Sequence, residues 1–218
     1  MRRLNSDGRR SPLAHKLGVF IAMLLVAMVL GRGLGEAAPS NPADTVHRFY
    51  DALLNTMQNG PSLGDKGRYD RLAPVIGQSF DVSYMAQKAV GAGWTKLTST
   101  QQQAVTEAFQ RYMTATYADR FDSYSGEKFQ VRGVEPSSFG TIVQSQIVKS
   151  DGAPVSINYL MHENTDGWQI ADVYLTGTIS QLATLRSQFS AVLARQGVDG
   201  LIAMLNEKAE TLVANNKS

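Results

Sequence analysis

The chain has no cysteine among its 218 residues and only three histidines. Disulfide bonds, thiolate metal sites and a lipid attached to an N-terminal cysteine are therefore excluded, and the core must hold the fold unaided. The longest apolar run, LGVFIAMLLVAMVL at residues 17–30, is shorter than the roughly 20 residues of a membrane-spanning helix. A basic stripe with interleaved aromatic residues, which marks nucleic-acid binders, is also absent.

Residues 1–37 have the pattern of a secretory signal peptide. Arginines and a lysine precede the apolar run, and Gly35-Glu36-Ala37 places small residues where a signal peptidase cuts. We predict cleavage after Ala37; the alternative is an uncleaved anchor. The leader carries six of the 21 Lys and Arg residues and two of the 19 Asp and Glu residues. Residues 38–218 thus retain 15 basic and 17 acidic groups, a net charge of −2, and are expected to form one periplasmic domain.

Apolar residues recur at helical spacing through the first half of the mature sequence and again at its end. Asp81 is a predicted N-cap, and Thr98 with Gln101 has the spacing of a capping box. Gly91 is expected to end a helix as its C-cap. We predict helices at residues 43–59, 69–76, 81–90 and 98–121, a loop at 59–67, and two final helices that meet at Gly197.

The periodicity changes to two residues after Gly126. Apolar and polar residues alternate at 129–132, 141–148, 155–161 and 168–175, and the separators EPSSFG, SDGAP and NTDG are rich in turn residues. We therefore predict an α+β fold, in which a curved antiparallel sheet of about four strands has helices packed on one face.

Residues 91–96, GAGWTK, contain the glycines and the lysine of a phosphate-binding loop. Such a loop follows a strand and begins a helix, so that the helix N-terminus faces the anion. Here a predicted helix precedes Gly91, and the next one begins only near Ser99. We interpret the segment as a helix end followed by a turn.

Patterns for metal or nucleophilic catalysis are also weak. His47 and His162 are far apart and lack metal-ligand spacing. GPSLG at 60–64 has the spacing G-x-S-x-G, but it lies in a predicted loop between two helices and lacks the preceding strand of a serine elbow. GTIS at 177–180 is better explained as a turn that leads to an N-cap serine.

One acid–base candidate remains. Strict alternation places Asp172 on an apolar strand face beside Trp168, Ile170 and Tyr174. A carboxylate in an apolar cleft is a candidate general base. The alternative is a structural Asp172 that is hydrogen-bonded to the backbone or to a tyrosine hydroxyl.

The long helix, the sheet face and the final helices all direct apolar side chains toward one interior. Such stripes are typical of a packed core. If the sheet and helices do not close completely, the same residues enclose an apolar cavity. The pattern leaves both possibilities open.

Three segments match a longer signature. FDVSYMAQKAVGAGWTKLTSTQQQAVTEAFQRYMTATYADRF at 80–121 has the form F-D-x-x-x-M-A-x-x-x-x-G-x-x-W-x-x-L-T. GWQIADVYLTGTIS at 167–180 is similar to W-x-x-x-D-V-x-x-x-G-x-S, with the serine one position later, and LRSQFSAVLARQGVDGLIAML at 185–205 has Arg-x-Gln-Phe. Together they resemble the MlaC-type periplasmic lipid carriers, also called the toluene-tolerance auxiliary family. TYADRFDSYSGEKFQV at 116–131 is most similar to the HpnM-like branch that is encoded with hopanoid biosynthesis.

The resemblance implies a carrier that shields lipid tails between an inner-membrane transporter and outer-membrane complex components. Its ligand would be a phospholipid or a hopanoid, with no catalytic residue, cofactor, metal or nucleic acid involved, and we expect a monomer. Met and aromatic side chains adapt to irregular ligands, and the candidate cavity wall combines them with aliphatic residues. It consists of Met85, Val90, Phe109, Met113, Tyr117, Val143, Ile157, Tyr159, Met161, Trp168, Ile170, Phe189 and Leu193.

Two other functions stay open. A cone-shaped small-molecule enzyme with Asp172 as acid or base requires an open cleft at that residue. An envelope adaptor with a solid core requires that no cavity exists.

Overall fold

The computed structural model describes residues 41–214, so the predicted signal peptide at 1–37 lies outside the described residues. The helices of this range are α2 (Pro42–Gln58), α3 (Gly60–Ser79), α4 (Val82–Val90), the 3-10 helix η1 (Gly91–Lys96), α5 (Ser99–Arg120) and α6 (Gln181–Ala214). Its strands are β1 (Lys128–Ser137), β2 (Gly140–Val148), β3 (Pro154–Asn164), β4 (Gly167–Leu175) and β5 (Ile179–Ser180). Within residues 41–214, no helix combines the length and the apolar character needed to cross a membrane.

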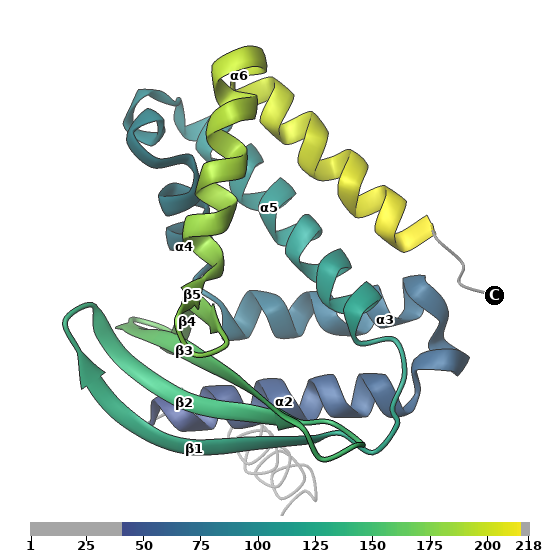
Figure 1. Cartoon of the computed structure of the whole chain (residues 1–218). Coiled ribbons are helices and arrows are strands. Elements are labelled where there is room, and N and C mark those ends of the chain that lie inside the picture. The colour runs from purple at the N-terminus through teal and green to yellow at the C-terminus, as the bar shows by residue number, and fades with distance from the viewer. Residues whose placement is uncertain (1–40, 215–218) are drawn as a thin grey trace, which may run out of the picture. The chain divides into compact units, whose positions relative to one another are not determined.

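The strands form one open antiparallel sheet in the order β1-β2-β3-β4-β5. Figure 1 shows that β1 and β2 are long and strongly curved. The α+β class and the antiparallel meander are confirmed. The described sheet has five strands rather than four, because the short β5 pairs with the end of β4 just before α6 begins.

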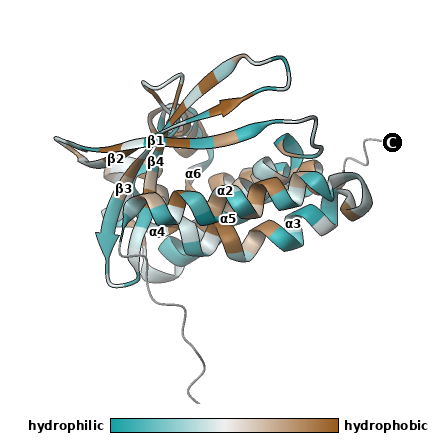
Figure 2. Ribbon diagram, turned by 90° about the horizontal axis from the view of Figure 1, so that it is seen from below, coloured by the Kyte–Doolittle hydropathy of each residue, from teal (hydrophilic) through white to brown (hydrophobic). Residues whose placement is uncertain are grey.

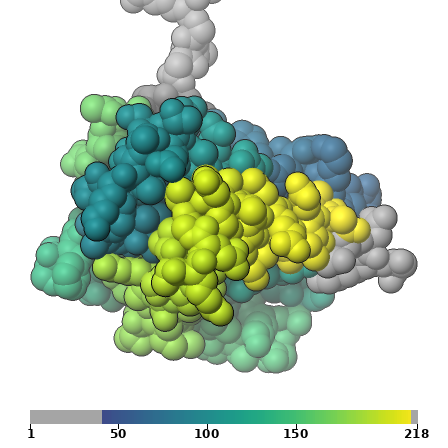
Figure 3. Space-filling view, turned by 90° about the horizontal axis from the view of Figure 1, so that it is seen from above, coloured from purple at the N-terminus to yellow at the C-terminus, as the bar shows by residue number. Residues whose placement is uncertain are grey.

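The helices pack mainly against one another and through α2 against the sheet. Helix α2 contacts β1, β2 and β4, whereas α5 packs on α3, α4 and α6. Apolar stretches of α2 and α5 and of the strands are brown in Figure 2. The two halves of α6, with α4 beside them, cover the face seen in Figure 3.

The predicted helix ends are confirmed where they depend on local chemistry. The Asp81 carboxylate accepts a hydrogen bond from the Tyr84 N–H at 3.0 Å. Thr98 and Gln101 form both hydrogen bonds of the capping box at the start of α5. Gly197, with φ 66°, interrupts α6 where two separate helices were predicted to meet.

The predicted loop at 59–67 is wrong, because α3 already begins at Gly60 and is interrupted only at Gly64, with φ 63°. Contacts with the end of α5 explain this. A Cβ on Gly60 would lie 1.8 Å from the Asp122 carbonyl oxygen, so only glycine allows this approach. The buried Arg68 guanidinium donates to the Gly60 carbonyl at 3.1 Å and to a carbonyl of α5 at 2.8 Å. Tertiary packing therefore overrides the turn-rich composition.

Phe49 of α2 lies at the centre of the aromatic core. Its ring contacts Phe80, Tyr117 and Tyr159 edge-on, with centroid distances of 5.2, 5.4 and 6.3 Å. Edge-to-face pairs of this kind stabilise a fixed arrangement of rings. The cluster joins α2, α5 and β3.

Candidate functional site

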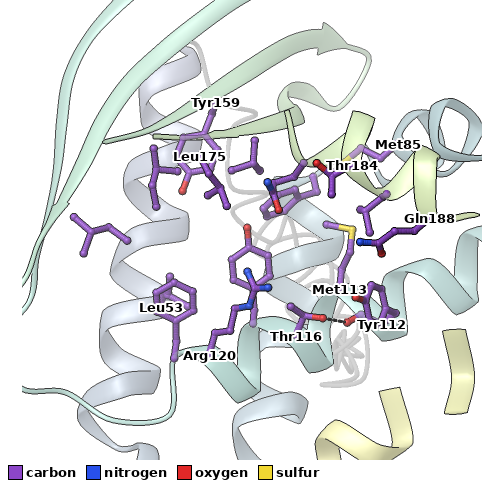
Figure 4. A pocket seen from close by; sticks show the side chains of 18 residues that line it. Leu53, Met85, Tyr112, Met113, Thr116, Arg120, Tyr159, Leu175, Thr184 and Gln188 are labelled. Carbon is purple, nitrogen blue, oxygen red and sulfur yellow. Dashed lines mark hydrogen bonds between the residues drawn. The ribbon is translucent and has the colours of Figure 1, made fainter. Parts of the chain in front are cut away.

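A pocket of about 260 Å³ lies between the sheet and the helices (Figure 4). Most of its wall is apolar or aromatic, and it draws on α2, α4, α5, α6 and three strands. The lining residues are Leu53, Phe80, Met85, Tyr112, Met113, Thr116, Tyr117, Arg120, Phe121, Ile147, Ile157, Tyr159, Val173, Leu175, Gln181, Thr184, Leu185 and Gln188.

Strand register builds the sheet side of the pocket. Ile157 of β3 pairs with Leu175 of β4, and Tyr159 pairs with Val173. Directly paired residues of antiparallel strands share a face. These four side chains therefore form one apolar surface toward the helices.

Helix α5 and its C-cap Phe121 supply two neighbouring rows of the wall, whose successive members are four positions apart in the sequence. One row is Met113, Tyr117 and Phe121, and the other is Tyr112, Thr116 and Arg120. Residues four apart lie one above the other on a helix. The two rows together make a broad strip of α5 line the pocket.

The polar side chains of the pocket gather on one side. Thr116 and Arg120 belong to α5, and Gln181, Thr184 and Gln188 belong to the first half of α6. Arg120, Thr184 and Gln188 are solvent-exposed, whereas Tyr159 and Val173 on the sheet side are buried. The pocket thus has an apolar floor at the sheet and a polar rim between α5 and α6.

The tyrosines of the floor are held in the neutral form. Ser145 Oγ donates to the Ile157 carbonyl, so the Tyr50 hydroxyl donates to Ser145 Oγ at 2.5 Å. Burial raises the pKa of Tyr159 well above its ordinary value, and the neighbouring Tyr50 adds to this. Burial likewise raises the pKa of Tyr117, with Tyr50 adding to the effect and Arg120 opposing it. Arg120 is therefore the one charged side chain in the lining of this pocket.

Asp172 does not share a face with Trp168 and Ile170, and the predicted alternation is wrong at this point. Leu160 pairs with Asp172 but Met161 pairs with Ile170, so Ala171 is an extra residue in a β-bulge. The bulge turns Asp172 away from the pocket floor and brings Val173 to it.

The Asp172 carboxylate is buried and hydrogen-bonded to the start of α6. It accepts from Ser180 Oγ at 2.5 Å, from the Leu182 N–H at 3.0 Å and from the Val173 N–H at 2.7 Å. This arrangement matches the structural interpretation of Asp172 rather than a free general base. Asp172 borders a separate groove of about 360 Å³ between α4, β4 and α6.

The other predicted motifs form no reactive cluster. Residues 91–96 form η1 between α4 and α5, and Gly91 has φ 73°, as a helix C-cap requires. Among the described residues, no three His, Asp or Glu side chains lie together in a way that could hold a metal ion. His162 lies near the end of β3, where its ring contacts Tyr84 with a centroid distance of 4.5 Å.

Five of the thirteen candidate wall residues line the pocket, namely Met85, Met113, Tyr117, Ile157 and Tyr159. The remaining eight belong to the packed core or its margin and do not line it. They are Val90, Phe109, Val143, Met161, Trp168, Ile170, Phe189 and Leu193. Phe109 and Phe189, for example, pack against each other edge-on at 6.0 Å. Sequence periodicity selects the inward face of an element but does not distinguish core from pocket.

The lining residues that the sequence did not identify fall into three groups. Apolar and aromatic residues that periodicity did not separate from the core form the first: Leu53, Phe80, Tyr112, Phe121, Ile147 and Leu185. Val173 and Leu175 were assigned to the wrong face because the bulge at Ala171 is invisible to a two-residue period. The polar rim residues were excluded because only apolar side chains were considered. Tyr112, Thr116 and Arg120 recur every four residues, directly beside the apolar row of Met113 and Tyr117. This second row is the sequence signal for a wider lining face on α5.

Two comparisons show similarity to known proteins. A sequence model of the family described as MlaC protein matches residues 47–207, a range that includes every lining residue. Among solved structures, the chain is similar to a phospholipid-binding protein from Ralstonia solanacearum, determined in complex with a phospholipid. This match has a TM-score of 0.67 and 24% sequence identity, and covers 79% of this chain and 99% of that one. At this identity the similarity shows a common fold.

Proposed function

Because the chain belongs to the MlaC protein family, we propose that it is a non-enzymatic periplasmic carrier that binds a lipid tail in the pocket between sheet and helices. The solved structure with the same fold holds a phospholipid, which supports a phospholipid as ligand. A hopanoid is the alternative ligand, suggested by the resemblance of residues 116–131 to the HpnM-like branch.

The observation that carries this proposal is the pocket itself. Its lining is apolar on the sheet side, and its volume is about 260 Å³. Since an apolar cavity of about 150 Å³ holds one benzene molecule, this space accommodates part of one alkyl chain. Each methylene group removed from water contributes about 0.8 kcal/mol, so a buried chain segment is sufficient for binding without a catalytic residue.

We propose that five residues contact the tail: Met85, Met113, Tyr117, Ile157 and Tyr159. All five line the pocket, and methionine and tyrosine side chains suit an irregular apolar guest. The eight other candidates from the sequence belong to the hydrophobic core or pack against it.

The wider setting follows from the family. We propose that residues 1–37 direct export and are removed, and that residues 38–218 form a monomeric carrier domain. The carrier would move lipid between an inner-membrane transporter and outer-membrane complex components. Because no nucleotide-binding loop was found in the sequence, direction would come from partners that bind the loaded and empty forms with different affinity.

The two alternative functions have less support. The enzyme alternative needs an open cleft at Asp172, and a groove does border this residue. However, its carboxylate accepts three hydrogen bonds and is therefore committed to a structural role. The solid-core adaptor needs an interior without a pocket, which does not fit the space between β3, β4, α5 and α6.

The decisive experiment is to purify the protein from the host periplasm, extract it with organic solvent and identify the released lipid by mass spectrometry. We expect a chain that begins at Ala38 and about one lipid per protein, with the lipid class deciding between phospholipid and hopanoid. Protein that releases no lipid would contradict the carrier function.

A matched pair of variants tests whether the pocket holds that lipid. Leu185 of α6 lines the pocket and is half-buried, whereas Ser187 of the same helix is exposed and does not line it. Leu185→Trp should fill the space and lower the bound lipid at least roughly fivefold, while Ser187→Trp should leave it unchanged. Equal lipid content in the two variants would place the ligand elsewhere.

A further inference from the structure

Arg120 stands at the boundary between the apolar pocket and solvent. It is in the last turn of α5 and is exposed, yet it is one of the pocket-lining residues. Figure 4 shows its side chain extending toward the other labelled residues of the pocket. It is the single charged group among the 18 residues of the lining.

The guanidinium of Arg120 is available to a ligand. Within residues 41–214, no hydrogen bond or ion pair ties it to another side chain, in contrast to Arg68, which is buried and fully engaged. Its positive charge reaches into the pocket, because it partly offsets the rise that burial and Tyr50 cause in the pKa of Tyr117.

A second groove continues from the same rim. This groove of about 480 Å³ shares Tyr112, Thr116 and Arg120 with the pocket and extends along the second half of α6, past Lys208. Asp119 and Glu207 also line it, so the groove carries both signs of charge. On the pocket side of the rim, Arg120 has no acidic neighbour among the lining residues. If the tail of an amphiphile occupies the pocket, the charged side chain nearest to its anionic group is therefore Arg120.

Resting on the proposed carrier function, we propose that Arg120 determines ligand specificity by binding the anionic group, a phosphate or a carboxylate, of an amphiphile whose tail occupies the pocket. The planar guanidinium can donate two parallel hydrogen bonds to such a group. Because a charged group loses much hydration free energy in an apolar interior, the anion remains at the rim while the tail enters. The carrier then selects anionic amphiphiles over uncharged ones with the same tail.

Isothermal titration calorimetry of the delipidated mature protein tests this with three probes. Dodecyl phosphate and dodecanol share one tail and differ in charge, and inorganic phosphate has the charge without the tail. The variants are Arg120→Gln and Arg120→Lys. Arg71→Gln is the control, because Arg71 is exposed and lies outside the pocket lining. Thermal unfolding of each variant verifies the fold.

We expect Arg120→Gln to weaken binding of dodecyl phosphate about ten- to hundredfold, the range of a hydrogen bond to a charged group, and to leave dodecanol binding unchanged. Arg120→Lys keeps the charge but loses the planar pair of donors, so its affinity should lie between those of wild type and Arg120→Gln. Arg71→Gln should bind both tailed probes like wild type. Inorganic phosphate alone should not bind measurably.

The other outcomes separate this inference from the carrier function. If Arg120→Gln binds dodecyl phosphate as tightly as wild type does, Arg120 is not the specificity residue, although the carrier function stands. If the variant weakens both tailed probes equally, Arg120 only shapes the pocket, which also overturns the proposal. Tight binding of inorganic phosphate would indicate a phosphate site rather than an amphiphile site. If wild type binds neither tailed probe, the carrier function itself fails.

Discussion

Single side chains link the sheet of this protein to its last helix. Asp172 accepts from two backbone N–H groups and from Ser180, and Ser180 Oγ in turn accepts from the Ala183 N–H at 2.9 Å. The first N–H groups of a helix have no partner within the helix and need such acceptors. Asp172 and Ser180 together supply them for α6, and so fix the position of the rim residues that follow.

Asp172→Asn should therefore affect stability and not chemistry. The amide retains one acceptor oxygen but places an N–H₂ group where a donor now points, which costs about 1–3 kcal/mol in the free energy of unfolding. Urea unfolding should show this loss, while dodecyl phosphate still binds to the folded variant. Asp166→Asn in the exposed β3–β4 turn is the control and should be near neutral. A fully stable Asp172→Asn variant would refute the capping role.

At the scale of elements, α4, η1 and α5 form one continuous segment in which two glycines have different roles. Gly91 has φ 73°, and a Cβ there would lie 3.0 Å from the Arg186 guanidinium. Gly93 has ordinary space, with its nearest contact at 3.8 Å. Of these two positions, only residue 91 has a backbone conformation that requires glycine.

Gly91→Ala should lower the free energy of unfolding by about 1–3 kcal/mol, because a residue with a Cβ is strained at this φ. Gly93→Ala, two residues away, should change it by less than about 0.5 kcal/mol. Chemical denaturation of the two variants measures the difference. Equal effects would mean that the whole turn, rather than the C-cap, sets the geometry.

The elements differ in how far the sequence predicts them. The start of α4 at Asp81 and the capping box of α5 are local, so residue types and spacing were sufficient. The start of α3 depends on Gly60 approaching the end of α5, and sequence pattern contains no information on that contact. The bulge at Ala171 shifts a strand by one residue and so exchanges its two faces, which moved Asp172 out of the candidate site and Val173 into it.

The buried tyrosines couple the stability of the entire domain to pH. Burial raises the pKa of Tyr117 and Tyr159 above the ordinary value of 10.0. Between the unfolded and the folded pKa, the unfolded chain binds fewer protons than the native state. The contribution of these tyrosines to the free energy of unfolding is therefore complete below about pH 10 and is lost as the pH rises further.

Tyr117→Phe removes one of these groups and should flatten the decline. Urea unfolding between about pH 9 and 11 measures the slope for the wild type and the variant. Tyr124→Phe is the control, since Tyr124 is 42% exposed and should leave the slope unchanged. Identical slopes for all three proteins would show that these hydroxyls do not govern the alkaline transition.

The pocket wall begins with Leu53 in α2 and is completed by Gln188 in α6. Its lining residues thus come from a long stretch of the chain, and the α6 side of the rim is the last part to be synthesised. A chain still emerging from a ribosome has the floor but lacks the α6 side of the rim. Under the proposed carrier function, such an unfinished chain cannot retain a lipid, because the pocket wall is complete only once α6 has been added.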